Sequence, residues 1–196
     1  METVKKRGKL KDRAYREVVK LKEFWNEAYP PLIADIGGNI GYYSETFLSV
    51  FSKSEVHSYE PHPYNLNHLT KIDSDRLTVH EYGLFNETTK LRIGLPAHRI
   101  NNNGLFSIHY KTDSVEVDLK NANDEVIRPH IVKIDVEGSE PQILECTEFF
   151  SQTKVLMIEM VHQDNFNMND RISTMLTSIG FKYKTNIGKN NKLWLR

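Results

Sequence analysis

Short apolar runs alternate with segments of helical spacing over most of the chain. Runs of strand length occur at 32–36, 56–59, 77–82, 131–136 and 155–160. Segments with the spacing of an amphipathic helix lie between or after them at 42–51, 63–69, 140–150 and 170–179. Because parallel strands are connected by helices that cover both faces of the sheet, this alternation predicts an α/β fold with a mostly parallel sheet.

Two regions depart from this alternation. Residues 84–128 contain two strand-like runs, 91–95 and 114–119, with a polar loop between them. This pattern predicts a hairpin inserted after the third strand. Near the end of the chain, runs at 181–185 and 193–195 flank a turn with glycine and asparagine, and they predict an antiparallel hairpin. A closing hairpin of this kind is unlike a pure dinucleotide-binding sheet.

The first 28 residues are predicted to form a basic helical arm in front of a domain at 29–196. Residues 1–22 hold nine lysines and arginines against three acidic residues, although the formal net charge of the chain is zero. Apolar residues within 18–25 recur at helical spacing, so the second half of the arm should pack on the domain. The basic charges allow two interpretations, a solvated helix face or a surface that steers an anionic partner such as nucleic acid or an acidic glycan.

Composition limits the available chemistry. Cys146 is the only cysteine, which excludes an internal disulfide, a thiolate zinc cluster and a cysteine-ligated iron–sulfur cluster. No stretch approaches the roughly 20 apolar residues of a membrane span, and the basic N-terminus lacks the apolar core of a secretory signal. We therefore expect a soluble, cytoplasmic chain whose chemistry uses oxygen and nitrogen groups.

An acid and three glycines accompany the end of the first predicted strand. Asp35 lies in the strand, and Gly37, Gly38 and Gly41 lie in the turn to the next helix. Glycines let the backbone approach a ligand, the helix start offers free N–H groups, and open α/β sheets bind ligands at this edge. The carboxylate of Asp35 would repel a pyrophosphate but suits the ammonium group of an amino acid. The turn therefore favours S-adenosylmethionine over a nicotinamide dinucleotide, with a purely structural turn as the alternative.

A second acid supports the same ligand. Glu60 ends the second predicted strand, about 20 residues after the glycine turn, where an acid in this architecture accepts hydrogen bonds from ribose hydroxyls. An acid at a strand end is often only solvated, but Asp35 and Glu60 at this spacing together predict an adenosyl ligand. Both side chains should face a cleft.

Four segments resemble the motifs of a known family. They are DIGGNIGYYS at 35–44, SYEPHPYNLNHL at 58–69, EYGLFNETTKLRI at 81–93 and HIVKIDVEGSEPQILE at 130–145. In this order they resemble the FkbM family of S-adenosylmethionine-dependent methyltransferases, over about residues 31–160. The resemblance implies a Rossmann-like class I methyltransferase fold with seven strands and an antiparallel last strand. It also implies O-methylation of sugars or natural products.

The resemblance further implies the residues of a cofactor site. Asp35, Gly37, Asn39 and Gly41 would hold the methionine part of the cofactor, and Glu60 would hold the ribose. The predicted cofactor site is completed by residues of the same motifs, namely Gly38, Pro61 and Asp135. Gly38 stands where alanine is common in the family, a change that we expect to be harmless.

Three charged residues alternate with apolar ones in and just beyond the predicted strand 131–136. Lys133, Asp135 and Glu137 should therefore share one face. We expect Asp135 beside the charged end of the cofactor and Glu137 or Lys133 at the proton of the acceptor, since a hydroxyl must lose its proton to become a good nucleophile. The alternative is an ion pair between Lys133 and Asp135, with Glu137 capping the next helix.

Glu159 and His162 follow at the end of the next predicted strand and complete the candidates for catalysis. His162 competes as a general base because imidazole titrates near neutral pH. Asp135 and Glu159, with His162 and Asp164, could instead bind Mg²⁺ against an acceptor hydroxyl. This metal site is an alternative to a metal-free base, which is our first hypothesis.

The segment 135–138 also bears on the acceptor. It lacks the two prolines and the aromatic residue that accompany an Asp or Asn in amino-methylating enzymes of nucleic acids. Our first hypothesis is therefore an O-methyltransferase for a hydroxyl of a sugar, glycan or other small molecule. The basic arm motivates a second hypothesis, a 2′-O-methyltransferase of RNA, and a subunit that binds S-adenosylmethionine without turnover is the third. Asn101, Asn102 and Asn103 are either amides that read sugar hydroxyls or only a flexible loop.

Overall fold

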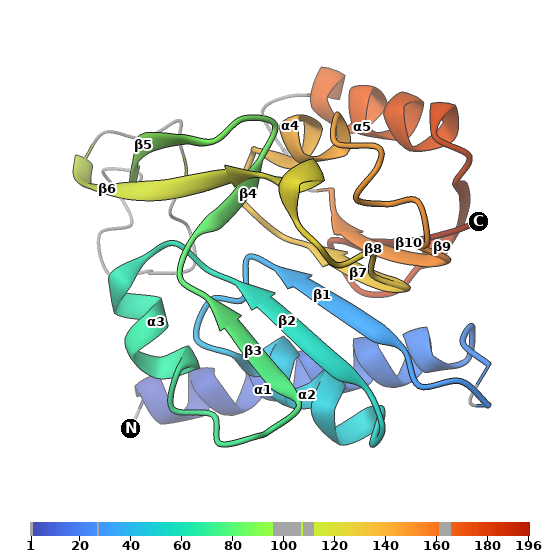
Figure 1. Ribbon diagram of the computed structural model, residues 1–196. Coiled ribbons are helices and arrows are strands. Elements are labelled where there is room, and N and C mark those ends of the chain that lie inside the picture. Colours follow the sequence, from blue (N-terminus) through green and yellow to red (C-terminus); the bar gives the residue numbers. More distant parts are fainter. Residues whose placement is uncertain (1, 27, 96–106, 108–111, 161–165) are drawn as a thin grey trace.

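A seven-stranded sheet forms the centre of the computed structural model, which describes residues 2–26, 28–95, 107, 112–160 and 166–196. Its strands in spatial order are β3 (Leu77–His80), β2 (Glu55–Tyr59), β1 (Leu32–Ile36), β7 (Ile131–Ile134), β8 (Val155–Glu159), β10 (Asn191–Leu195) and β9 (Lys182–Asn186). The first five are parallel, and β10 runs antiparallel to both β8 and β9 (Figure 1). The predicted Rossmann-like sheet with a closing antiparallel hairpin is confirmed.

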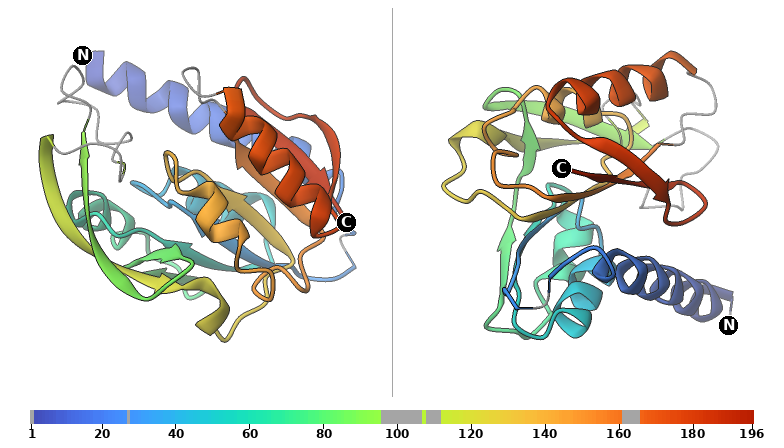
Figure 2. Two further views of the ribbon diagram at one scale, coloured as in Figure 1. Left: turned by 90° about the horizontal axis from the view of Figure 1, so that it is seen from above. Right: turned by 90° about the vertical axis from the view of Figure 1, so that its right-hand side faces the viewer.

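Helices cover both faces of this sheet. α1 (Glu2–Lys22) and α2 (Tyr42–Val50) lie on one face, and α4 (Glu140–Leu144) and α5 (Phe166–Ser178) lie on the other (Figures 1 and 2). α3 (Pro63–Leu69) follows β2 and begins with a proline, whose missing N–H costs nothing in a first helical turn.

Each face of the sheet has its own apolar core, because successive residues of a strand point to opposite faces. Ile33 packs with Leu21 of α1 and Phe47 of α2 on one face. Val132 packs with Leu176 of α5 on the other. Each such buried side chain contributes about 1.5–3 kcal/mol to stability. Since Leu21 belongs to this core, the second half of the basic arm packs on the sheet, as predicted.

The inserted segment forms a second sheet of three strands. In spatial order they are β4 (Gly83–Phe85), β6 (Thr112–Asn121) and β5 (Thr89–Leu95). The antiparallel pair of β5 and β6 confirms the predicted hairpin, whereas the parallel strand β4 was not predicted. Phe85, Ile93, Val117 and Leu119 form a small core of this sheet, and the short 3-10 helix η1 (Ala122–Asp124) leads back toward β7.

Several element boundaries differ from the predicted ones, among them those of β7, α4 and α5. β7 ends at Ile134 instead of residue 136, because the chain then turns toward α4. α4 ends at Leu144 instead of residue 150. Beyond it the N–H of Phe149 donates to Asn123 Oδ1, a tertiary bond that replaces a regular helical bond. α5 begins at Phe166, earlier than the predicted residue 170.

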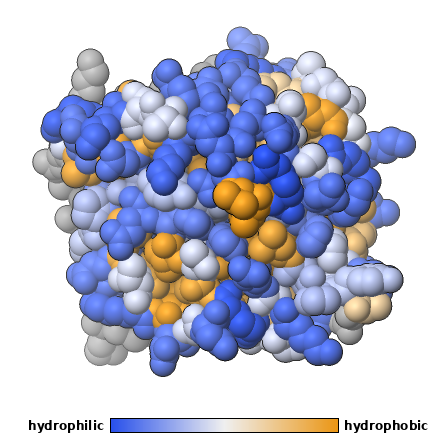
Figure 3. Space-filling view, in the orientation of Figure 1, coloured by the Kyte–Doolittle hydropathy of each residue, from blue (hydrophilic) through white to orange (hydrophobic). Residues whose placement is uncertain are grey.

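The surface in the view of Figure 3 is mostly hydrophilic, and apolar residues form only small groups on it. Isolated apolar residues of this kind are normal on a globular domain. None of the described helices combines the length and the apolar character that a membrane crossing requires.

Candidate functional site

Acidic residues from four strands gather at one edge of the sheet. Asp35 lies near the end of β1, Glu60 follows β2, Asp135 follows β7 and Glu159 ends β8. These strands are parallel, so their carboxyl ends share the edge at which open α/β sheets bind ligands. The acids that the sequence assigned to the cofactor and to the acceptor are therefore brought together.

The loop after β1 is shaped by three residues in left-handed conformations. Gly37, Asn39 and Gly41 have φ angles of 79°, 50° and 95°. A Cβ atom at Gly37 would lie 1.9 Å from the carbonyl oxygen of Asp135, and one at Gly41 would lie 2.3 Å from Ile72 Cδ1. Both the conformation and the close packing of this loop therefore require glycine at these two positions.

Gly38 also has no room for a side chain. A Cβ atom there would lie 2.1 Å from Ser58 Oγ, so an alanine would require this hydroxyl to move. Glycine in place of the alanine that is common in the family was expected to make no difference. In this chain the two residues are equivalent only if Ser58 can shift. The N–H groups of Gly37 and Gly38 both donate to the carbonyl oxygen of Tyr59, at 3.0 Å, and thereby fix the loop to the end of β2.

Glu60 was predicted to face an open cleft, but it is buried against this loop. Its Oε2 accepts from the N–H of Asn39 and its Oε1 from the N–H of His62, each at 2.8 Å. Burial raises the pKa of Glu60, and the two backbone N–H donors oppose that rise. The carboxylate thus holds the loop in place, and the side chain of Asn65 is a further hydrogen-bond partner. The next residue, Pro61, packs near Gly83 of β4.

Asp35 is also buried, and its carboxylate belongs to an internal network. Its Oδ2 accepts from the hydroxyl of Ser44 at 2.7 Å, and its Oδ1 lies 3.1 Å from Lys133 Nζ. Asp35 was predicted to face a cleft, but its side chain is fully buried.

Lys133 connects Asp35 and the glycine loop with Asp135. Its ammonium group donates to the carbonyl oxygen of Gly37 at 2.8 Å and lies 3.8 Å from Asp135 Oδ2. The predicted pair of Lys133 and Asp135 therefore exists, but the contact with Asp35 is shorter. Burial alone would lower the pKa of Lys133, yet the charges of Asp35 and Asp135 outweigh it and raise this pKa. The ammonium group is therefore held as a cation, and its side chain is only 2% exposed.

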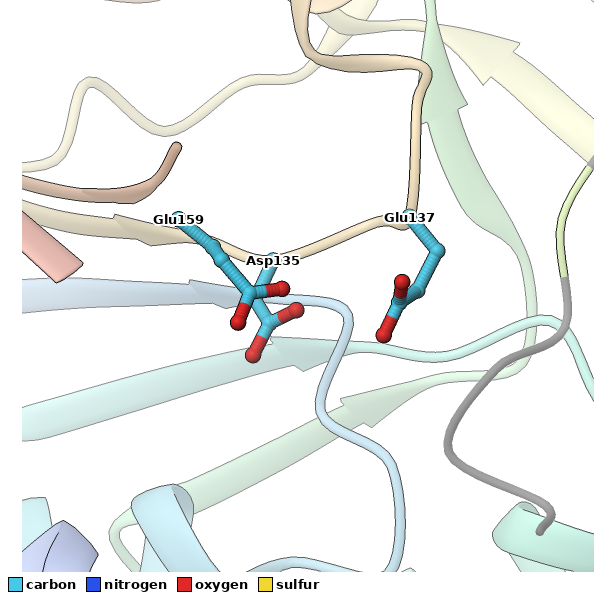
Figure 4. Close-up of side chains that lie close together, drawn as sticks. All are labelled: Asp135, Glu137 and Glu159. Atoms are coloured by element: carbon cyan, nitrogen blue, oxygen red, sulfur yellow. The ribbon is translucent and has the colours of Figure 1, made fainter. Parts of the chain in front are cut away.

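Asp135, Glu137 and Glu159 form a cluster of carboxyl groups, called the acidic cluster below. Each offers one oxygen atom within 4.8 Å of the others, so the three could hold a metal ion. Figure 4 shows the side chains on the same side of the chain, with Asp135 and Glu159 next to each other. The prediction that Glu137 belongs to the strand face of Lys133 is wrong, because β7 has ended and Glu137 has a φ of 55°. The left-handed turn, and not strand alternation, brings Glu137 to Asp135.

The acidic cluster holds more negative charge than its surroundings balance. Burial and the charge of Asp135 raise the pKa of Glu137 to about 9. The same two causes raise the pKa of Glu159 to about 8, although Asn190 and Arg13 act in the opposite direction. Each group therefore tends to hold a proton at neutral pH. A cation at the cluster would lower both pKa values.

Helix capping was the alternative role for Glu137, but the N-cap residue of α4 is Ser139, which makes no side-chain capping bond, and the neighbouring acid Glu140 holds the loop before the helix. Glu140 Oε1 accepts from the N–H of Gly138 at 3.2 Å and from the N–H of Val136 at 3.4 Å. The backbone of Glu137 is held instead by the inserted segment, since the hydroxyl of Ser107 donates to its carbonyl oxygen at 2.6 Å. The Glu137 carboxyl group is thus left to the acidic cluster.

Several predicted site residues lie outside the described part of the chain. They are His162, Asp164, Asn101, Asn102 and Asn103. Sequence reasoning also missed two residues of α1 that reach the site, Arg13 and Glu17. Glu17 is an acid among the buried positions Ala14, Val18 and Leu21. A charged residue within an apolar stripe was the signal that could have identified it.

Comparisons with known proteins agree with this geometry. A family model described as "Methyltransferase FkbM domain" matches residues 35–183. No curated protein sequence matches the chain significantly. A precorrin-6y C5,15-methyltransferase from Geobacter metallireducens is 12% identical, with a TM-score of 0.56 over 92% of this chain and 88% of that one. Fibrillarin from Aeropyrum pernix, solved with bound S-adenosyl-L-methionine, is 10% identical, with a TM-score of 0.54 over 93% and 75%. At these identities the solved structures show a shared fold.

Proposed function

The chain belongs to the methyltransferase FkbM family, and on this premise we propose that it methylates a hydroxyl group of a sugar, glycan or other small molecule. Its general activity is that of an S-adenosylmethionine-dependent methyltransferase. The observation that carries the oxygen acceptor is the acidic cluster, whose three carboxyl groups each place an oxygen within 4.8 Å of the others and in which the pKa values of Glu137 and Glu159 are raised, to about 9 and about 8. A hydroxyl must lose its proton during the reaction, and a carboxyl group of raised pKa can accept that proton once a bound cation has displaced its own.

The residues of the site fit a cationic cofactor. Burial and mutual repulsion leave the acidic cluster short of positive charge, so it would repel a pyrophosphate and attract a cation. S-adenosylmethionine, when bound, supplies an activated methyl group on a positively charged sulfur. We assign the backbone of 37–41, together with Glu60, Pro61 and Asp135, to the cofactor site. Asp35 supports this site indirectly, because it pairs with Lys133, which donates to the loop at Gly37.

Glu137 is our first choice for the proton acceptor. Its backbone is held in place by Ser107, and burial raises the pKa of its carboxyl group to about 9. Glu159 is the second choice, because its Oε1 already accepts from the side-chain amide of Asn190 at 3.1 Å. We assign Lys133 a positioning role, since its buried ammonium group is shared by Asp35, Asp135 and the glycine loop. His162 remains a candidate base from the sequence alone.

A metal-dependent reaction is the alternative at the same place. The oxygens of the acidic cluster are close enough to bind one divalent cation, and carboxylate oxygens are the ligands that Mg²⁺ prefers. A bound Mg²⁺ would activate the acceptor hydroxyl without a protein base. Loss of turnover with EDTA and its recovery with Mg²⁺ would favour this alternative over the base.

RNA is the second acceptor class, favoured by exposed basic side chains on α1. Lys9, Lys11 and Arg16 are exposed on this helix. Lys11 also pairs with Glu45 of α2, which reduces the free positive charge of this surface. If RNA is the acceptor, its binding should weaken steeply as salt is raised, because phosphate contacts release counterions.

Transfer of a labelled methyl group tests the proposed function. The protein is incubated with S-adenosylmethionine labelled in the methyl group and with an extract of its host cells, which is then separated into small molecules, glycans and RNA. We expect label in the small-molecule or glycan fraction, in a product heavier by one methylene. Label in nuclease-sensitive material would show an RNA acceptor. Calorimetric binding of S-adenosylmethionine without any labelled product would favour a non-catalytic subunit.

A further inference from the structure

Arg13 of α1 approaches the acidic cluster from outside the segment that matches the family model. The match begins at residue 35, whereas α1 ends at residue 22. Arg13 Nη2 lies 3.9 Å from Glu159 Oε1, within ion-pair distance, and its side chain is 32% exposed. α1 therefore carries a positive charge to the edge of the sheet where the acids gather.

Glu17 fixes the position of this guanidinium group. Glu17 is 3% exposed, and its Oε1 accepts from Arg13 Nε at 3.0 Å. Its Oε2 accepts from the hydroxyl of Tyr43 at 2.5 Å and from Asn191 Nδ2 at 2.7 Å. One carboxylate thus connects α1 with α2 and β10. A Cβ atom at Gly188 would lie only 1.9 Å from Glu17 Oε1, so this carboxylate has little freedom to move.

Asn191 ties the same network to Glu159. It pairs directly with Glu159 between the antiparallel strands β10 and β8, and residues directly opposite each other on such strands have side chains on the same face of the sheet. Arg13 therefore reaches Glu159 directly through its guanidinium group, and its partner Glu17 accepts from Asn191, which lies opposite Glu159 in the sheet.

The planar guanidinium group suits a role between two carboxylates. It offers several N–H donors in a fixed fork, so one nitrogen can bind Glu17 while another faces Glu159. The other described cation near the cluster, Lys133, lies closest to the buried Asp35. Arg13 is thus the cation available to Glu159.

We infer that Arg13 is a positioning residue for methyl transfer, which holds the carboxyl group of Glu159 beside Asp135 and makes α1 a part of the active site. This inference rests on the proposed function, because it assigns the acidic cluster to the reacting side. It gives α1 a role beyond packing and beyond the binding of an anionic partner.

Five variants test the inference: Arg13→Gln, Arg13→Lys, Glu159→Gln, the double variant Arg13→Gln/Glu159→Gln, and the control Lys53→Gln at an exposed position outside the site. We expect Arg13→Gln to lower the rate of labelled-methyl transfer at saturating S-adenosylmethionine by about 10-fold, since small displacements of reacting groups are costly. The affinity for S-adenosylhomocysteine, measured by calorimetry, should stay within about two-fold of that of the parent. Arg13→Lys should recover part of the rate, and Lys53→Gln should match the parent.

The double variant separates positioning from a general effect on the fold. If Arg13 acts through Glu159, Arg13→Gln should lower the rate no further once Glu159 is already Gln. Additive losses would overturn the inference. So would a weakened affinity for S-adenosylhomocysteine with an unchanged rate, which would show that Arg13 binds the cofactor directly.

Unfolding in urea gives a readout that needs no acceptor. The midpoint changes caused by Arg13→Gln and Glu159→Gln should be non-additive in the double variant, because the two side chains interact. Additive changes would overturn the inference whatever the rate of transfer. The absence of labelled product with the parent protein would instead contradict the proposed function, and the unfolding cycle would then still decide whether Arg13 positions Glu159.

Discussion

The two halves of the candidate site differ in how their charges are balanced. Around the glycine loop, Asp35 is paired with Lys133 and Ser44, and Glu60 accepts two backbone N–H groups. In the acidic cluster, Glu137 and Glu159 have raised pKa values because burial and the charge of Asp135 are not compensated. The charges of the first half are paired or hydrogen-bonded, although burial still raises the pKa of Glu60, and this half should support stability. The second half is under electrostatic repulsion that a cation or a proton relieves, as expected of a reacting site.

The largest effect should come from breaking the buried pair in the balanced half. Lys133→Met leaves the charge of Asp35 buried with only a hydroxyl donor, so we expect the free energy of unfolding to fall by about 3–5 kcal/mol. Denaturation in urea measures this loss. The control is Asp35→Asn combined with Lys133→Met, which removes both charges and should recover much of the stability. A loss below about 1 kcal/mol for Lys133→Met would contradict the balance that we assign to this half.

The acidic cluster should respond mainly in activity. Glu137→Gln keeps the shape of the side chain but removes nearly all its basicity, so the rate of methyl transfer should fall by about 10²-fold or more. The affinity for S-adenosylhomocysteine should change by less than about two-fold, since a proton acceptor is used only in the reaction. Glu87→Gln, at an exposed position outside the site, is the control. If Glu137→Gln retained full activity, the base would have to be sought at Glu159 or His162.

A smaller effect is expected at Glu60, the residue that we propose to bind the ribose of the cofactor. Glu60→Gln removes the charge that accepts the N–H groups of Asn39 and His62. We expect the binding of S-adenosylhomocysteine to weaken by about 1.5–3 kcal/mol, the range for a lost hydrogen bond to a charged group. Calorimetry measures the affinity, with the exposed Glu116→Gln as the control. Unchanged affinity in a folded Glu60→Gln protein would place the cofactor elsewhere on this edge.

The balanced half could be predicted from the sequence because its signals are local. A buried strand, a glycine turn and an acid at the end of the next strand lie within about 30 residues, and their spacing defines the loop. What the sequence did not reveal is that Asp35 and Glu60 are buried. Their burial depends on Lys133, which is distant in the sequence, and on backbone N–H groups that no residue pattern displays.

The residues of the acidic cluster were predicted from the sequence, but the reason given for Glu137 was wrong. Asp135 and Glu159 were expected together because parallel strands end at one edge, and they do lie together. Glu137 joins them through a left-handed turn, a conformation that is uncommon outside glycine and that a strand pattern cannot indicate. Arg13 was missed because its approach to Glu159 depends on the packing of α1, a tertiary contact across most of the chain.

The smallest predicted effect is a gain of stability in Glu137→Gln, the variant that should lose activity. The pKa of Glu137 is about 9 in the folded protein, against 4.5 for an ordinary glutamate. The folded state therefore binds more protons than the unfolded state between these values, so the stability that Glu137 contributes is present at low pH and is lost as the pH rises toward 9. Glu137→Gln removes this loss. Allowing for solvent screening, we expect the variant to exceed the parent in free energy of unfolding by about 1 kcal/mol at pH 8 and by little at pH 5.

Urea unfolding of both proteins at these two pH values checks the sign of the effect. Saturating S-adenosylmethionine should reduce the difference at pH 8, because a bound cation lowers the pKa of Glu137 and relieves the same repulsion in the parent. Neutral S-adenosylhomocysteine is the matched control and should leave the difference largely intact. A variant less stable than the parent at pH 8 would mean that Glu137 is a structural residue. The contrast between a satisfied half and a repelling half of this site would then be wrong.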